Sequence, residues 1–260
     1  YYLTDMVGIL RAHGAAMAAV DCADAVELMG VNSRIQLAQA TRAMQERINE
    51  RHMAAGVTML DPTQVWIGPD VKIGRDTTLL PGTMLWGATQ IGENCLVGPQ
   101  TRLTDTRVGD GCTVDETVAV QAVLDNDVDC GPRAYLRPGA HLCDGSKAGT
   151  HVEIKKSTVG KGSKVPHLSY IGDCTIGEGV NIGAGTITCN YDGKNKNPTT
   201  IGDGSFIGSD TMLVAPVNIG RGCTVGAGST ITRDVPDGSL AVERSEQTMK
   251  AGWRPKWDRA

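Results

Sequence analysis

Several features are scarce in this sequence of 260 residues, and each scarcity argues against a class of function. The 25 Lys and Arg residues are outnumbered by 29 Asp and Glu residues, so no basic excess favours nucleic acid as a partner. No segment approaches the ~20 consecutive apolar residues of a membrane span. We therefore expect a soluble cytoplasmic protein that binds neither nucleic acid nor membrane.

Paired cysteines and a conventional start are also missing. The eight cysteines never form a Cys-x-x-Cys pair, which argues against a zinc ribbon or a redox motif. Because nothing indicates secretion, we expect them to be small reduced residues of the core or its corners. Tyr1 is not an initiator residue and no signal peptide follows it, so we expect a fragment of a longer protein.

What the sequence does contain is a six-residue period between Ile67 and Arg233, in which an aliphatic residue recurs and glycine often follows it. The clearest pairs are Ile67-Gly68, Ile73-Gly74, Ile91-Gly92, Val97-Gly98, Cys130-Gly131, Ile171-Gly172, Ile182-Gly183, Ile201-Gly202, Ile207-Gly208, Ile219-Gly220 and Val225-Gly226. This period fits neither a helix nor a two-faced sheet; it is typical of hexapeptide β-helix repeats.

The repeat predicts an all-β fold, a parallel β-helix of roughly nine or ten coils with three hexapeptides in each triangular coil. The aliphatic residue should point into a narrow prism, and the glycine should support a corner where φ is positive. The scarcity of aromatic residues, 4% of the chain, agrees with a prism too narrow for many rings.

The N-terminal part reads differently. The first ten residues predict an apolar helical run with Thr4 or Asp5 as the N-cap, residues 15–20 favour a short strand, and a longer helix follows the turn at residues 30–34. Apolar residues of that helix predict one buried stripe: Ile35, Leu37, Ala38, Met44, Ile48 and Met53. These pieces bury too little apolar surface to form a domain alone. We therefore divide the chain into a domain remnant (1–34), a linker helix and entry to the first coil (35–62), the β-helix (63–233) and a tail (234–260).

Two stretches interrupt the period, and repeat proteins often carry function at such points. The first is the basic stretch 160–170 with His167, and the second is the polar loop 188–199. Arg137 and Lys155 stand eighteen positions apart, one coil, so we expect two cations on one face, suited to a phosphate or simply exposed to water. His167 is a candidate general base or an incidental surface histidine.

A histidine-based zinc centre is not favoured. Catalytic zinc commonly takes three side-chain ligands, and His141, His151 and His167 are separated by 10 and 16 positions, which match no multiple of a coil.

Four strings resemble one family: Leu-Arg-Pro-Gly (136–139), Val-Glu-Ile-Lys-Lys (152–156), Gly-Lys-Gly-Ser-Lys-x-x-His-Leu-Ser-Tyr-Ile-Gly-Asp (160–173) and Asn-Ile-Gly-Ala-Gly-Thr-Ile-Thr-Cys-Asn-Tyr-Asp-Gly (181–193). They resemble the bacterial bifunctional glucosamine-1-phosphate acetyltransferase and N-acetylglucosamine-1-phosphate uridyltransferase, across nearly the whole chain. The resemblance implies a left-handed β-helix, a homotrimer with shared active sites, and acetyl transfer from acetyl-CoA to the amine of glucosamine-1-phosphate, for UDP-N-acetylglucosamine and cell-wall synthesis.

The same resemblance implies roles for individual residues. His167 matches the general base and Glu153 the residue that orients it. Residues matching sugar-phosphate ligands are Arg137, Lys155 and Lys196; those matching sugar ligands are Tyr170, Asn181 and Asn190; those matching acetyl-CoA ligands are Ala184, Tyr191, Ser209, Ala227 and Arg244. Acetyl transfer would need no metal. Val165-Pro166 departs from the small residues usual before the histidine and puts the path of that loop in doubt.

In the N-terminal part, Gly-Val-Asn-Ser-Arg (30–34) resembles the string whose asparagine, here Asn32, helps to bind magnesium in the uridyltransferase site. The resemblance places its partner aspartate and the nucleotide loop upstream of Tyr1, so we expect no uridyl transfer from these residues. Two alternatives remain: another hexapeptide acyltransferase, such as a serine or maltose type, and a non-catalytic trimeric scaffold. The second predicts regular faces without a basic loop.

Overall fold

The computed structural model describes residues 2–254 and divides into two units, residues 1–44 and 45–260. The first unit holds α1 (Asp5–Ala12), the 3₁₀ turn η1 (Ala25–Leu28) and the start of α2 (Arg34–Ala54). Neither α1 nor η1 has a buried residue, and the predicted strand at residues 15–20 is wrong, since that segment has no regular structure. No helix of the described residues combines the length and the apolar character needed to cross a membrane.

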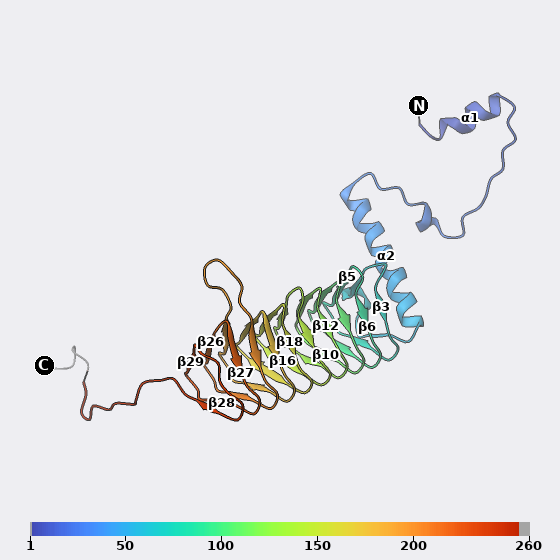
Figure 1. The fold of residues 1–260 in the computed structure, drawn as a ribbon. Helices are drawn as coiled ribbons and strands as arrows, with labels where there is room; N and C mark the ends of the chain where they lie inside the picture. The colour runs from blue at the N-terminus through green and yellow to red at the C-terminus, as the bar shows by residue number, and fades with distance from the viewer. Residues whose placement is uncertain (1, 255–260) are drawn as a thin grey trace. The chain divides into compact units, whose positions relative to one another are not determined.

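The second unit is a stack of short parallel strands in three sheets, with the 3₁₀ turn η2 (Pro62–Gln64) between its first two strands (Figure 1). Sheet A contains β1 (Thr58–Met59), β4 (Thr78–Leu79), β7 (Leu96–Val97), β10 (Thr113–Val114), β13 (Asp129–Cys130), β16 (Lys147–Thr150), β19 (Lys164–His167), β22 (Asn181–Ile182), β25 (Phe206–Ile207), β28 (Thr224–Val225) and β30 (Leu240–Ala241).

Sheet B contains β2 (Trp66–Ile67), β5 (Met84–Trp86), β8 (Arg102–Thr104), β11 (Val118–Val120), β14 (Tyr135–Leu136), β17 (Glu153–Lys155), β20 (Tyr170–Gly172), β23 (Ile187–Cys189), β26 (Met212–Val214) and β29 (Thr230–Ile231). Sheet C contains β3 (Lys72–Ile73), β6 (Gln90–Ile91), β9 (Arg107–Val108), β12 (Val123–Leu124), β15 (His141–Leu142), β18 (Thr158–Val159), β21 (Cys174–Ile176), β24 (Thr199–Ile201) and β27 (Val217–Ile219). The predicted left-handed parallel β-helix of hexapeptide repeats is confirmed.

The core is the predicted column of aliphatic side chains inside the prism. Leu79, Leu103, Leu136 and Ile154 have no exposed surface. Most buried hydroxyls bond to backbone carbonyls, either in their own turn or in the next coil; Ser163 Oγ, for example, donates to the carbonyl of Gly177 at 2.6 Å. Among the described residues, Ser146 Oγ and Thr199 Oγ1 are buried without such a partner.

The glycines of the repeat differ from the prediction. Of those that directly follow a core aliphatic, only Gly98 and Gly131 have positive φ. Most of the others are required by close packing of consecutive coils: a β-carbon at Gly74 would lie 2.5 Å from the carbonyl carbon of Gly92, whereas one at Gly68 would meet nothing closer than 3.4 Å. Stacked backbones about 4.8 Å apart leave no room for a side chain at this corner.

The number of residues per coil is not always the eighteen expected from three hexapeptides. Thr113 pairs with Asp129, sixteen positions on, whereas Asp129 pairs with Lys147, eighteen positions on. The largest interval, Asn181 to Phe206, contains the loop after β23 that stands out from the stack (Figure 1). This is the second of the two interruptions predicted from the sequence.

The buried face of α2 is mainly polar, so the predicted apolar stripe is wrong in its N-terminal part and holds only for Ile48 and Met53, which pack against the core. Ile35, Leu37 and Met44 are exposed, and the buried residues are Gln45, Ile48, Asn49 and His52. Gln45 Nε2 and Asn49 Nδ2 donate to the carbonyl of Val65 at 2.7 and 3.0 Å. The first coil has no preceding coil to bond its backbone, and these amides take that place.

Candidate active site

Sheet B carries several of the predicted site residues on its outer face. Ile154 is fully buried, so Glu153 and Lys155 on either side of it point outward. The strand pairing places Arg137 one coil before them and Tyr170 one coil after, on the same face. The sequence prediction that Arg137 and Lys155 share a face is therefore confirmed by the register.

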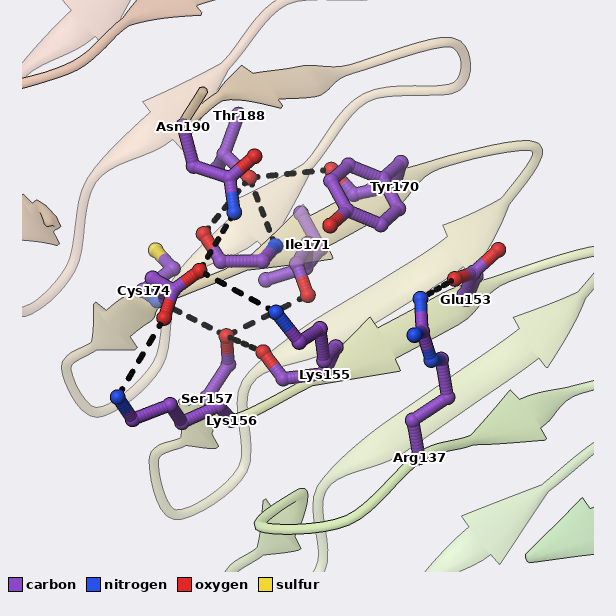
Figure 2. Close-up of polar contacts among 12 residues, drawn as sticks. Arg137, Glu153, Lys155, Lys156, Ser157, Tyr170, Ile171, Cys174, Thr188 and Asn190 are labelled. Carbon is purple, nitrogen blue, oxygen red and sulfur yellow. Dashed lines mark hydrogen bonds and ion pairs between the residues drawn. The ribbon is translucent and has the colours of Figure 1, made fainter. Parts of the chain in front are cut away.

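Arg137 and Glu153 form an ion pair across two coils. Arg137 Nη1 lies 2.8 Å from Glu153 Oε1, and both side chains are a little over one-third exposed (Figure 2). The hydrogen bond that Arg137 donates to Glu153 raises the pKa of Arg137 above its ordinary value. The guanidinium therefore stays charged. Its side chain is partly exposed, so its remaining N–H donors can bond to water or to a bound anion.

Asp173 is the centre of a second polar group that the sequence reading did not assign. Its Oδ2 accepts a 2.6 Å hydrogen bond from Asn190 Nδ2, and Lys155 Nζ and Lys156 Nζ lie 3.9 Å from its carboxylate (Figure 2). Spacing alone did not indicate it, because Lys155 pairs with Gly172, seventeen positions on, and Asp173 follows that glycine. Asp173 holds Lys155 and Asn190, two predicted substrate residues, beside each other.

Gly172 provides the space in which these side chains meet. A β-carbon there would lie 2.5 Å from Tyr170 Oη and 2.7 Å from Asn190 Nδ2. Asn190 is buried, at 4% exposure, so its amide has little freedom to move aside. Glycine at position 172 is therefore part of how the site is formed.

The loop after β23 carries Tyr191 and Lys196. Lys196 Nζ lies 4.0 Å from the centre of the Tyr191 ring, a cation–π contact. Asp192 organises the loop: its Oδ1 accepts from the backbone N–H groups of Lys194 and Asn195 at 2.8 and 2.6 Å. These donors lower the pKa of Asp192 to about 2. The loop therefore presents an exposed aromatic ring and a cation in a defined arrangement.

A surface pocket of about 430 Å³ lies beside this group. Lys156 and Lys196 line it from two different segments, and Asp173 contributes a carboxylate. Two cations at one hollow suit an anionic group such as a phosphate.

His167 is exposed and is the last residue of β19, an inner strand of sheet A. Within residues 2–254, no hydrogen bond or ion pair joins it to Glu153, whose carboxylate bonds to Arg137 instead. Val165 and Pro166 do not form a loop before His167. They belong to a continuous strand, since Ala148 pairs with Val165 and Thr150 with His167. The assignment of Glu153 as its orienting partner stays a prediction.

Four of the five residues predicted to contact acetyl-CoA lie in a column with His167, and the fifth, Tyr191, lies on the loop after β23. Lys164, Asn181, Phe206 and Thr224 pair in series in sheet A, and His167, Ala184, Ser209 and Ala227 each stand three positions after one of them. Arg244 joins this column, because its Nη1 donates to the carbonyl of Ala227 at 2.9 Å. Asn181 lies on β22, half-buried. The column leads along the axis of the β-helix.

Asn32 lies in the first unit, where its backbone N–H donates to Gln36 Oε1 at 2.7 Å. Its side chain is exposed. Magnesium binding through Asn32 stays a prediction.

Two family models match parts of the chain. Residues 198–233 match the bacterial transferase hexapeptide (six repeats), and residues 88–122 match the hexapeptide repeat of succinyl-transferase. Both segments lie in the β-helix. Among solved structures, a UDP-N-acetylglucosamine acyltransferase from Bacteroides fragilis aligns with 66% of this chain and 68% of its own at 16% identity, with a TM-score of 0.44. That similarity is too low to carry an argument about this chain.

Curated relatives match far more of the chain. The bifunctional protein GlmU of Heliobacterium modesticaldum is 52% identical over 250 residues, which are 96% of this chain and 55% of the relative. The bifunctional protein GlmU of Brevibacillus brevis is 48% identical over 259 residues, 100% of this chain and 56% of the relative. The chain spans about half the length of the curated relatives it matches, and over that span it belongs to the GlmU family.

Proposed function

We propose that this chain transfers the acetyl group of acetyl-CoA to the amine of glucosamine-1-phosphate in the cytoplasm. The observation that carries the proposal is how the site residues are arranged on sheet B and at the strand ends of sheet A. Arg137 and Lys155 share the outer face of sheet B, while His167 and four of the predicted acetyl-CoA residues form a column at the strand ends of sheet A. Family membership supports the same reading.

In the proposed reaction, the amine nitrogen attacks the carbonyl carbon of the thioester. A nitrogen–carbon bond forms, the carbon–sulfur bond breaks, and CoA leaves as its thiol. His167, as a neutral imidazole, takes the proton that the amine must lose. Arg137 and Lys155 bind the phosphate by charge-assisted hydrogen bonds, and Lys196 adds a third cation from the loop. No step requires a metal.

We propose further that three chains assemble and share these sites. Exposed apolar side chains support this, because Phe206 and Leu168 are 50% and 63% exposed on or beside sheet A. The loop bearing Tyr191 and Lys196 is long enough to reach beyond its own coil. A monomer mass in light scattering at assay concentration would count against a shared site.

The test of the reaction is thiol release from acetyl-CoA, measured with glucosamine-1-phosphate and with glucosamine as acceptors. We expect glucosamine-1-phosphate to react far faster at low acceptor concentration, since glucosamine lacks the group that the cations bind. Equal rates would reject the phosphate site and favour another hexapeptide acyltransferase. A complete absence of thiol release would favour the scaffold alternative.

A further inference from the structure

Sheet C carries a cluster of three different metal-binding groups that the proposed reaction does not use. An oxygen of Asp125, a ring nitrogen of His141 and Sγ of Cys143 all lie within 4.8 Å of one another. His141 Nε2 and Asp125 Oδ2 are 2.8 Å apart. All three residues are half-buried, so the group is reachable from outside.

The backbone fixes these residues in place. Leu142 is fully buried, so His141 and Cys143 on either side of it both point outward. Asp125 N donates to the carbonyl of Leu142 at 2.8 Å, which brings Asp125 alongside Cys143 in the neighbouring coil. Cys143 N in turn bonds to the carbonyl of Val159 at 2.9 Å. The three side chains therefore rise from strand ends held on both sides by neighbouring coils.

Cys143 and Cys189 are half-buried, whereas the other five repeat cysteines are buried. Cys189 Sγ donates to the carbonyl of Ile187 at 3.9 Å, and Cys95 Sγ, among the buried ones, donates to that of Gly109 at 3.1 Å. Among residues 2–254, no hydrogen bond from the Cys143 thiol is found. Asp125 lies beside the thiol, and Asp144, which directly follows Cys143 in the chain, brings a second carboxylate to this region. The surroundings are negative and favour a cation over a bare thiolate.

We propose that Asp125, His141 and Cys143 bind a borderline divalent cation of the Zn²⁺ type, with water as a fourth ligand. One carboxylate, one imidazole and one thiolate suit this ion better than Mg²⁺ or Ca²⁺, which prefer oxygen ligands alone. Tetrahedral zinc separates its ligand atoms by roughly 3.3–3.7 Å. Side-chain rotation on the rigid strands supplies the adjustment.

This site is separate from the proposed acetyl-transfer site. It lies on sheet C, whereas Arg137, Lys155 and Tyr170 belong to sheet B, and none of its three residues lines the pocket beside Asp173. It also differs from the three-histidine centre that the sequence argued against, because the thiol and the carboxylate replace two of the histidines. The proposal does not depend on the acetyl-transfer function.

The test is metal binding by untagged protein after removal of metals with EDTA. We expect about one Zn²⁺ per chain in equilibrium dialysis, and with Co²⁺ a thiolate-to-cobalt charge-transfer band together with visible bands of tetrahedral cobalt. Cys143→Ser should abolish the charge-transfer band. His141→Gln and Asp125→Asn should each weaken Zn²⁺ binding by at least about tenfold.

The matched controls are Cys22→Ser and His13→Gln, which remove a thiol and an imidazole in the first unit. Both should bind the metals like the unaltered chain, and circular dichroism should show every variant folded. Failure of the unaltered chain to bind Zn²⁺ would overturn the proposal. So would a Co²⁺ charge-transfer band that survives Cys143→Ser or disappears with Cys22→Ser.

Discussion

Arg137 and Glu153 meet across consecutive coils, with 2.8 Å between the guanidinium nitrogen and the carboxylate oxygen. The resemblance implies two different tasks for them, phosphate binding for Arg137 and orientation of His167 for Glu153. Their contact couples the two tasks, because a change in either residue alters the other's electrostatic surroundings. Several of the following predictions depend on this pair.

Removal of either proposed phosphate ligand should weaken binding of the acceptor selectively. We expect Arg137→Ala and Lys155→Ala to raise KM for glucosamine-1-phosphate about ten- to hundredfold, since each removes a charge-assisted bond worth ~1.5–3 kcal/mol. Steady-state kinetics with each substrate varied provides the measurement. The control is Arg133→Ala, which breaks the exposed pair of Arg133 with Glu116. A similar loss for acetyl-CoA would indicate a structural role.

His167→Ala should lower kcat by about 10² to 10⁴, the usual contribution of a general base, with little effect on acetyl-CoA binding. The loss should shrink at high pH, where more of the amine is already deprotonated in solution. A pH series of kcat for both proteins tests this. Retention of more than about a tenth of the original kcat would reject His167 as the base.

Glu153→Gln separates two roles. If Glu153 chiefly holds Arg137, the variant should raise KM for glucosamine-1-phosphate and leave the pH profile of kcat in place. If it orients His167 in the assembled protein, kcat should fall, by less than in His167→Ala, and the profile should shift. We expect the KM effect to be present, because the Arg137 contact exists within one chain.

The polar face of α2 should contribute to stability. Gln45→Leu and Asn49→Leu each remove one of the two side-chain donors to the buried Val65 carbonyl, and the loss of one such hydrogen bond typically costs about 0.5–1.5 kcal/mol. Urea unfolding should show this loss. Gln39→Leu, on an exposed part of the same helix, is the matched control. An unchanged free energy of unfolding in both buried variants would show that the amides are dispensable.

The loop bearing Tyr191 should keep its structure into acid. The pKa of Asp192 falls from its ordinary value of 3.8 to about 2, so its stabilising effect is complete above about 3.8 and is lost as pH falls through about 2. Amide hydrogen exchange at Lys194 and Asn195, corrected for intrinsic rates, should show protection that declines only in that window. Asp192→Asn should reduce this protection at neutral pH; unchanged protection would contradict the assigned role.

Much of the fold could be predicted from the sequence, because the core residues of a repeat protein recur at a fixed short spacing. An aliphatic residue every six positions predicts the prism whichever coil is considered. The interruption near residue 190 marks a protruding loop, whereas the one predicted at residues 160–170 is wrong, because β19 and β20 continue the stack there. The family strings named the candidate residues before any distance was known. Each of these signals depends on residues close together in the chain.

Only the tertiary structure decided which side chains meet. Because coils contain sixteen, seventeen or eighteen residues, a fixed spacing does not predict which residues stack. Lys155 lies eighteen positions after Arg137, but the residue that pairs with Lys155 in the next coil is Gly172, seventeen positions on. The partner of Glu153, the central place of Asp173 and the polar face of α2 all depend on register between coils. A period specifies the strands, whereas contacts between their side chains depend on the actual length of every intervening turn, and the sequence pattern carries that information only weakly.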